Sequence, residues 1–172
     1  MRAMDSKVLR IFTSAKAAAP MTEGGEIRAF AGKGIEGDRY FSAAGTFSKK
    51  EGPGRQITLF EKEALEAVAR DYKFEIDPSE MRRNVMVEGV PLNHLVGREF
   101  TVGSVRLRGI KLCEPCGHLE KLTGKPVQKA FAHRGGLNCE ILVSGKIRVG
   151  DAIELEPAEP EDVTEKVSVA KR

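Results

Sequence analysis

The chain has 172 residues, of which 41% are hydrophobic and 31% charged, and its formal net charge is +3. This length fits one domain with a sizeable core, and the composition excludes a chain that is disordered throughout. No apolar run approaches the roughly 20 residues of a membrane-spanning helix, and Arg10 and Lys16 interrupt the N-terminal region where a secretory signal would lie. We therefore expect a cytoplasmic protein without a membrane contact.

The number of cysteines and the net charge further limit the possible classes of protein. Three cysteines are an odd number for a disulfide framework, and a reducing cytosol would keep Cys113, Cys116 and Cys139 as thiols. The mild positive charge, the absence of tryptophan and the presence of only two tyrosines argue against nucleic acid as a partner. The cysteines therefore point to reactivity or metal binding.

In chain order, short β-like runs dominate, separated by glycine and proline. The predicted strands are Val8 to Phe12, Glu26 to Phe30, Gln56 to Phe60, Asn84 to Val87, Phe100 to Ile110, Cys139 to Val143, Lys146 to Val149 and Ala152 to Leu155. Two-residue turn signals, Ser144-Gly145 and Gly150-Asp151, predict antiparallel hairpins in a meander for the last three. The charged, proline-containing segment 157–172 predicts a disordered tail, which leaves a single domain over residues 1–156.

Helical signals are few. Apolar residues at helical spacing predict an amphipathic helix over residues 61–72. Asp77, followed by proline, predicts a short capped turn. Leu119 and Leu122 predict a further helix directly after Cys116.

The segment from Cys113 to Leu122 carries the clearest chemical signal. Cys116 follows a proline and precedes a helical pattern, so we expect it at a helix N-terminus, where the positive end of the dipole favours the thiolate. A thiolate can carry a persulfide or bind a soft metal. The alternative is that both cysteines are small buried residues. A zinc site is a weaker hypothesis because one C-x-x-C supplies only half of four ligands, and a thioredoxin-like pair lacks its βαβ context.

Glycines and arginines at predicted strand ends suggest anion binding. The glycine-rich segment 32–40 exposes backbone N–H groups that suit an anion, although glycines between strands more often serve as turns. Arg82, Arg83 and Arg134 lie at the mouths of strands, where guanidinium groups suit phosphate or carboxylate. A single such arginine can equally be a solvated charge. The three histidines show no triad spacing, and we expect structural or surface roles for them.

The ordered set of these segments resembles the MOSC family, the C-terminal domain of molybdenum-cofactor sulfurases. The resemblance runs from about Val8 to Leu155 and implies a mainly β fold, a MOSC-type β-barrel similar to the pyruvate-kinase β-barrel domain, with a few short helices. The segments that carry it are Gly-Ile-Glu-Gly-Asp-Arg-Tyr, Arg-Gln-Ile-Thr-Leu, Arg-Arg-Asn, Leu-Val-Gly-Arg-Glu-Phe, Cys-Glu-Pro-Cys, His-Arg-Gly-Gly and Val-Gly-Asp.

The resemblance also implies site residues. Cys116 matches the family cysteine and is expected to be both the catalytic residue and the metal ligand, with Cys113 as an auxiliary thiol at most. The residues expected to contact the molybdenum cofactor are Arg82 and Asn84 from the Arg-x-Asn pattern, and Arg39, Arg55 and Arg134 by loop position.

The function implied is that of a sulfur carrier or molybdenum-cofactor-binding protein. No pyridoxal phosphate is expected in this chain, so a cysteine desulfurase or another sulfur donor would act as one partner, and a molybdoenzyme or electron-transfer protein as another. One alternative is a molybdenum-dependent reductase of N-hydroxylated substrates that takes electrons from a separate protein. Another is a non-catalytic interaction module with an inert cysteine.

Overall fold

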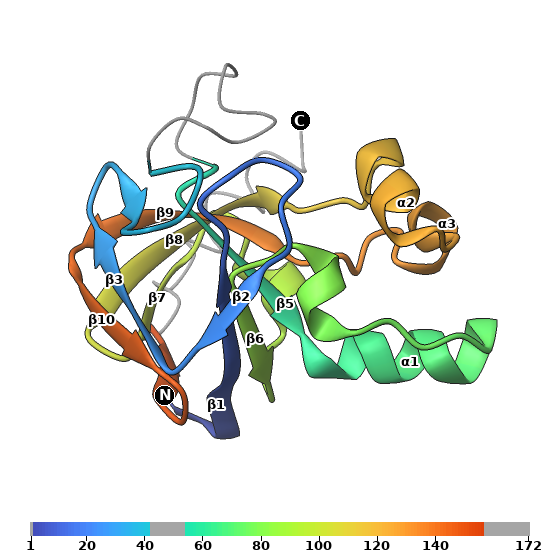
Figure 1. The fold of residues 1–172 in the computed structure, drawn as a ribbon. Coiled ribbons are helices and arrows are strands. Elements are labelled where there is room, and N and C mark those ends of the chain that lie inside the picture. The colour runs from blue at the N-terminus through green and yellow to red at the C-terminus, as the bar shows by residue number, and fades with distance from the viewer. Residues whose placement is uncertain (1, 42–53, 157–172) are drawn as a thin grey trace, which may run out of the picture.

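The structure is a computed structural model that describes residues 2–41 and 54–156, and its architecture is mainly β (Figure 1). The predicted tail over residues 157–172 lies outside the described residues. No helix among those described is long and apolar enough to cross a membrane.

Seven strands close into a barrel in the order β11-β7-β8-β9-β5-β6-β1, because β1 pairs with both β6 and β11. Neighbouring strands are antiparallel except for β5 and β6, which are parallel. The short strand β2 (Thr22–Gly24) extends the sheet from β1. The barrel strands are β1 (Arg2–Thr13), β5 (Ile57–Glu61), β6 (Val85–Glu88), β7 (Glu99–Val102), β8 (Val105–Leu112), β9 (Leu137–Val143) and β11 (Ala152–Leu155).

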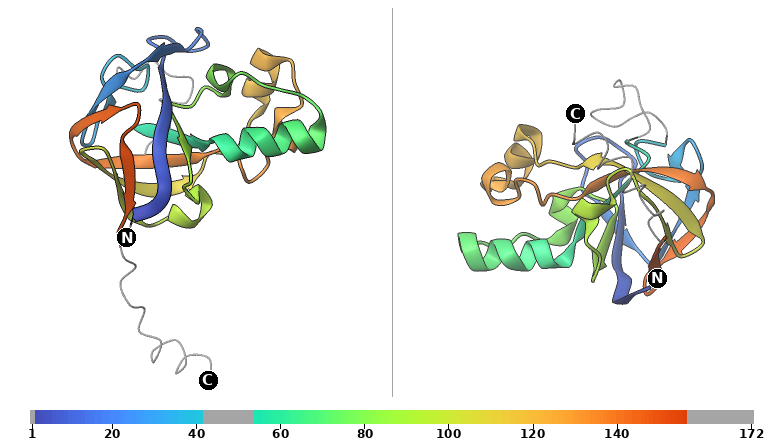
Figure 2. Two further views of the ribbon diagram at one scale, coloured as in Figure 1. Left: turned by 90° about the horizontal axis from the view of Figure 1, so that it is seen from below. Right: turned by 180° about the vertical axis from the view of Figure 1, so that it is seen from behind.

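A second sheet of three strands lies beside the barrel (Figures 1 and 2). It contains β10 (Gly145–Arg148), β3 (Glu26–Phe30) and β4 (Gly34–Ile35) in that order. Exposed and buried residues alternate along β3, as expected for a strand with one face on the core. The buried side chains of both sheets form one apolar cluster that fills the barrel, in which Ile57, Phe100 and Leu107 are fully buried.

The helices gather on one side of the barrel in every view (Figures 1 and 2). They are α1 (Lys62–Tyr72), α2 (Gly117–Thr123) and α3 (Val127–Ala130), with the 3-10 turn η1 (Pro78–Met81). A second apolar cluster joins these elements to the barrel and includes Phe12, Val68, Met81, Leu119 and Phe131. The other 3-10 turn, η2 (Leu92–Leu95), contributes Leu92 and Leu95 to the barrel cluster instead. The apolar stripe of α1 and the buried Leu119 of α2 thus attach the helices to the sheet.

The mainly β fold and three local helical predictions are confirmed. Helix α1 begins after Glu61, η1 is capped by the Asp77 side chain, which accepts a hydrogen bond from the Ser79 N–H, and α2 follows Cys116. The single run over residues 100–110 was wrong, because a turn at Gly103 divides it into β7 and β8.

The predicted meander at the C-terminal end was also wrong. Strand β10 pairs with β3, and β11 pairs with β7 and β1. At 144–145 the chain therefore passes from the barrel to the three-stranded sheet, and at 150–151 it returns to the barrel. Barrel closure requires β11 beside β1, and this tertiary requirement overrides local hairpin propensity.

Candidate functional site

A cleft of about 410 Å³ opens where the barrel meets the helical side of the molecule. It combines thiol, cationic and amide side chains. Its lining residues are Arg39, Tyr40, Arg55, Thr58, Arg82, Arg83, Lys111, Leu112, Cys113, Glu114, Cys116, His118, Leu119 and Asn138.

Five separate chain segments supply this lining, and the barrel fixes most of them. The turn after β4 supplies Arg39, and the segment leading into β5 supplies Arg55. Arg82 lies between η1 and β6, Cys113 directly follows β8, and Asn138 is in β9. Strand pairing of β5, β6, β8 and β9 therefore brings residues more than 80 positions apart in sequence to one place.

Positive charge dominates the cleft. Five lysine or arginine side chains line it, against one carboxylate among the described lining residues, Glu114. That carboxylate is turned toward His133: its oxygens accept hydrogen bonds from the His133 backbone N–H at 2.9 and 3.2 Å, and Oε2 lies 3.2 Å from His133 Nδ1. This distribution of charge favours an anionic ligand.

Cys116 lies at the helix N-terminus that the sequence predicts. It is the N-cap residue of α2, with extended dihedral angles of φ −125° and ψ 170°, and it packs against the helical-side apolar cluster while lining the cleft. Its side chain makes no capping hydrogen bond, so the thiol is not used to satisfy the helix backbone.

The two other cysteines lie in different environments. Cys113 is half-buried and lines the cleft, where burial raises the pKa of its thiol while Arg83 and Arg55 oppose the increase. Cys139 is fully buried in the barrel, and burial raises the pKa of that thiol well above its ordinary value. Cys139 is therefore an apolar core residue, whereas Cys113 and Cys116 share one cleft.

Arg82 carries the clearest sign of a missing partner. It adopts a left-handed conformation with φ 58°, and Nη1 donates a hydrogen bond to the Ala19 carbonyl oxygen. Nη2 is buried and has no hydrogen-bond partner among the described residues. Burial, together with the nearby Arg39 guanidinium, lowers the pKa of Arg82. A buried charged donor without a partner is costly, and an anion beside it would offset that cost.

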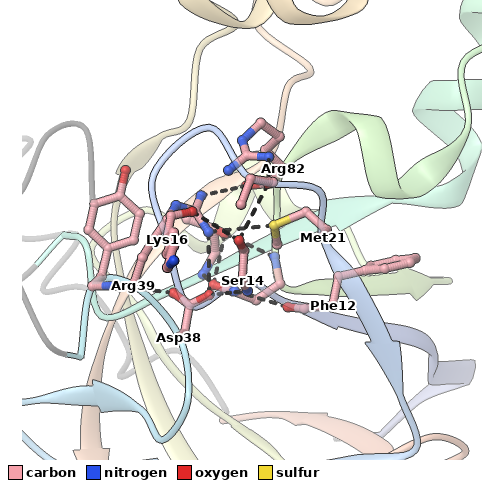
Figure 3. Close-up of polar contacts among 11 residues, drawn as sticks. Phe12, Ser14, Lys16, Met21, Asp38, Arg39 and Arg82 are labelled. Atoms are coloured by element: carbon pink, nitrogen blue, oxygen red, sulfur yellow. Dashed lines mark hydrogen bonds and ion pairs between the residues drawn. The ribbon is translucent and has the colours of Figure 1, made fainter. Parts of the chain in front are cut away.

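Arg39 lines the cleft but is held within the fold (Figure 3). Its side chain is buried, with Nη1 3.3 Å from the Asp38 carboxylate and Nη2 3.4 Å from the Arg82 carbonyl oxygen. Asp38 also accepts a hydrogen bond of 3.0 Å from the Ser14 N–H, and the Arg39 guanidinium lies over the Tyr40 ring. The geometry thus links the glycine-rich turn to the backbone of Arg82.

Two expected cofactor contacts lie elsewhere. Asn84 is buried and outside the cleft lining: its side chain accepts from the Thr58 N–H and donates to the Phe12 carbonyl oxygen, each at 3.1 Å. These bonds join β5 and β1 to the start of β6 and leave its amide engaged by the protein. Arg134 also lies outside the lining, where Nε donates to the Ala130 carbonyl oxygen at 2.8 Å and the guanidinium lies near Tyr72.

Arg83, which the sequence places beside Arg82 at a strand mouth but which was not among the expected cofactor contacts, also lines the cleft. Nε donates to the Gly135 carbonyl oxygen at 3.2 Å, and Nη2 donates to that of Cys113 at 3.1 Å. Nη2 also lies 3.5 Å from the Glu114 carbonyl oxygen. One guanidinium therefore holds the cysteine loop against the glycine pair that precedes β9. Its adjacency to Arg82 was the available signal.

The two glycines that precede β9, Gly135 and Gly136, have a packing role. A Cβ on Gly135 would lie 2.5 Å from the Cys113 carbonyl oxygen and 3.0 Å from Pro115 Cδ. Gly136 has φ 123°, and its carbonyl oxygen accepts a hydrogen bond of 2.7 Å from the Cys113 N–H. The absence of side chains here allows the cysteine loop to approach the barrel.

Comparison with known proteins agrees with this geometry. The MOSC domain model matches residues 47–154. The chain belongs to the MOSC domain family. A search of curated proteins found no sequence match.

Solved structures show the same MOSC fold. The YuaD protein from Bacillus subtilis is 20% identical with a TM-score of 0.75, over 90% of this chain and 97% of that one. YiiM from Geobacillus stearothermophilus is 14% identical with a TM-score of 0.68, over 91% and 77% of the respective chains. YiiM from Escherichia coli is 17% identical with a TM-score of 0.63, over 89% and 71%.

MOSC domains are associated with the molybdenum cofactor, and the cleft residues fit such a group. The unsatisfied Arg82 Nη2 suits an anionic end, and the cysteines are soft ligands of the kind that molybdenum accepts. His118 Nε2 is likewise buried without a hydrogen-bond partner among the described residues, and its side chain lines the same cleft. No cluster of three or more His, Cys, Asp or Glu side chains suited to a metal ion occurs within residues 2–41 and 54–156, which gives the zinc hypothesis no support.

Proposed function

We propose that this MOSC protein is a sulfur carrier that binds the molybdenum cofactor, with Cys116 as its reactive thiol. The observation that carries the proposal is the cleft itself, in which two thiols meet five cationic side chains. A persulfide on Cys116 would lie beside these cations, which stabilise anionic sulfur. The cofactor, when bound, supplies molybdenum as an acceptor of sulfur or as a redox centre.

Different residues of the cleft would bind the anionic group, position the backbone and carry the sulfur. Arg82 offers the unsatisfied Nη2 donor, and Lys111 and Arg55 add positive charge for an anionic group. Arg39 holds the Arg82 backbone, and Arg83 holds the Cys113 loop.

Cys116 supplies the thiolate that accepts sulfur or binds the metal. A cysteine desulfurase or another sulfur donor would load it, and a molybdoenzyme would be the recipient.

The proposal is tested by purifying the protein anaerobically from a host that makes the cofactor, then measuring pterin fluorescence and molybdenum per chain. The loss of one charged hydrogen bond costs about 1.5 to 3 kcal/mol, so Arg82→Ala is expected to weaken cofactor affinity by roughly one to two orders of magnitude. Arg82→Lys is expected to restore only part of it, because lysine lacks the paired donors. Cys116→Ser is expected to lose molybdenum while keeping the fold.

Arg28→Ala is the matched control, because Arg28 is an exposed arginine on β3 outside the cleft lining. Equal pterin and molybdenum contents in the wild type, both Arg82 variants and Cys116→Ser would contradict the proposal. If the loaded protein also reduced N-hydroxylated substrates with an added electron donor, the reductase alternative would replace the carrier role.

A further inference from the structure

The proposed function gives a chemical step to Cys116 alone, although the cleft contains a second thiol. Cys113 and Cys116 both line it, separated by Glu114 and Pro115. The four residues form the connection between β8 and α2, where the Cys113 N–H donates to the Gly136 carbonyl oxygen and the Cys116 carbonyl oxygen accepts from the Glu120 N–H of α2. Both thiols are therefore held on one short connection beside the same cleft.

We propose that Cys113 resolves the persulfide on Cys116, so that the pair releases the carried sulfur as hydrosulfide and closes an intramolecular disulfide. This step presupposes that Cys116 carries sulfur, the function proposed above. It makes the protein a sulfide-releasing carrier with a dithiol and a disulfide state.

The reaction balances without an outside oxidant, because a persulfide is at the oxidation level of a disulfide. The Cys113 thiolate attacks Sγ of the Cys116 persulfide and forms the Sγ–Sγ bond. The bond between Cys116 Sγ and the terminal sulfur breaks, and that sulfur leaves with the electron pair as hydrosulfide. The proton from the Cys113 thiol ends on the hydrosulfide. Return to the dithiol state takes two electrons from a dithiol reductant.

Cations in the cleft act in favour of both the attacking and the leaving sulfur, although burial keeps the thiol pKa of Cys113 above its ordinary value. Arg83 and Arg55 act on the Cys113 thiol in the direction that stabilises the thiolate, and they oppose the effect of burial. The same guanidinium groups and Lys111 line the cavity into which a hydrosulfide anion would leave. A larger thiolate fraction at Cys113 and a stabilised leaving group both accelerate thiol exchange.

The backbone of Cys113 is held by groups outside its own segment. Its N–H donates to the Gly136 carbonyl oxygen at 2.7 Å, and its carbonyl oxygen accepts from Arg83 Nη2 at 3.1 Å. The Asn138 side chain lines the same cleft and acts to lower the thiol pKa of Cys113. A thiol that only filled space in the core would resemble Cys139, which is fully buried in the barrel cluster.

The test loads the reduced protein with inorganic polysulfide under anaerobic conditions, removes the excess, and follows hydrogen sulfide release and the masses of cysteine peptides. The wild type is expected to release about one hydrogen sulfide per chain and to form the Cys113–Cys116 disulfide. Cys113→Ser and Cys113→Ala are expected to retain the Cys116 persulfide on the order of tenfold longer or more, because the internal nucleophile is gone. Cys139→Ala serves as the matched control and is expected to behave like the wild type.

The outcomes separate the two proposals. A wild type that keeps its persulfide as long as both Cys113 variants, or that moves it to Cys113 without forming a disulfide, overturns the resolving role and leaves the carrier function standing. Folded Cys113 variants that acquire no persulfide on Cys116 overturn the carrier function, and the resolving step with it. Circular dichroism establishes that each variant is folded.

Discussion

Arg83 shows how a single side chain can hold the cysteine loop from a neighbouring segment. Its guanidinium joins the carbonyl oxygens of Gly135 and Cys113, which belong to segments on either side of α2 and α3. Hydrogen bonds from a charged donor to such carbonyls contribute about 1.5 to 3 kcal/mol. The positive charge also lowers the thiol pKa of Cys113 against the effect of burial.

We predict that Arg83→Met lowers the free energy of unfolding by about 1 to 3 kcal/mol and slows alkylation of Cys113 at neutral pH. The alkylation slows because removing the cation raises the thiol pKa, so that less thiolate is present. Arg83→Lys is expected to keep much of the alkylation rate but not the stability. Lysine retains the positive charge, but it lacks the planar set of donors with which the guanidinium binds two carbonyl oxygens. Denaturant titration and labelling of Cys113 in a Cys116→Ser background measure both effects. Unchanged labelling in Arg83→Met would contradict the electrostatic part.

At the same scale, the sequence indicated which residue types line the cleft better than it indicated which way each side chain points. Arg82 and Cys116 lie in the cleft as predicted, because a turn after η1 and a helix N-terminus place them there. Asn84 is adjacent to Arg83, yet its amide faces Thr58 and Phe12. Which way a polar side chain points at the start of a strand depends on the neighbouring strands, and the sequence does not state which strands those are.

At the scale of elements, the approach of the segment before β9 to the cysteine loop depends on Gly135. We predict that Gly135→Ala displaces the Cys113–Pro115 backbone, because the new Cβ would meet the Cys113 carbonyl oxygen at 2.5 Å. Overpacking of this kind costs about 1 to 3 kcal/mol. The labelling rate of Cys116 is expected to change together with stability, since the same loop positions both cysteines.

Gly25→Ala is the matched control, because a Cβ there meets nothing within 4 Å. Its effect on the free energy of unfolding is expected to stay within about 1 kcal/mol, with no change in thiol labelling. Thermal unfolding and thiol-labelling kinetics of both variants make the comparison. Equal behaviour of the two alanine variants would show that the close approach at Gly135 is not required.

Strand pairing illustrates what local patterns omit. Most predicted strands exist near their expected bounds, because alternating apolar residues and turn signals are local properties. Their partners are not local: β10 crosses to β3, and β5 lies beside β6 in parallel. The cleft depends on these pairings, so its full membership, including Lys111 and Asn138, could not be obtained from sequence spacing.

At the scale of the whole molecule, two apolar clusters meet beside the cleft. The barrel cluster contains Cys139, and the helical-side cluster has Cys116 packed against it. The closed sheet and the smaller helical layer are thus separate parts of the fold, and the segment with Cys113 and Cys116 lies between them. Burial in the barrel therefore keeps one thiol inert while the junction leaves two others beside the cavity.

The burial of Cys139 in the barrel predicts that the free energy of unfolding decreases at alkaline pH. Burial raises the pKa of Cys139 well above its ordinary value, so the folded state keeps this thiol neutral after the unfolded state has begun to ionise. Above the unfolded pKa of about 8.5, the unfolded state binds fewer protons, and stability falls as pH rises. The contribution is fully present below that value and decreases by about 1.4 kcal/mol per pH unit until the folded pKa is reached.

Cys139→Ala isolates this effect, because it removes the thiol from a fully buried position while the other titrating groups stay in place. The variant is expected to be less stable than the wild type at pH 7, since the substitution leaves a small cavity. The difference between the two is expected to shrink as pH rises from about 8 to 10, because only the wild type loses the contribution of the neutral Cys139 thiol. Urea titrations of both proteins at several pH values under reducing conditions measure it. A difference in unfolding free energy that stays constant across this range would show that Cys139 ionises equally easily in both states, contrary to its burial in the barrel.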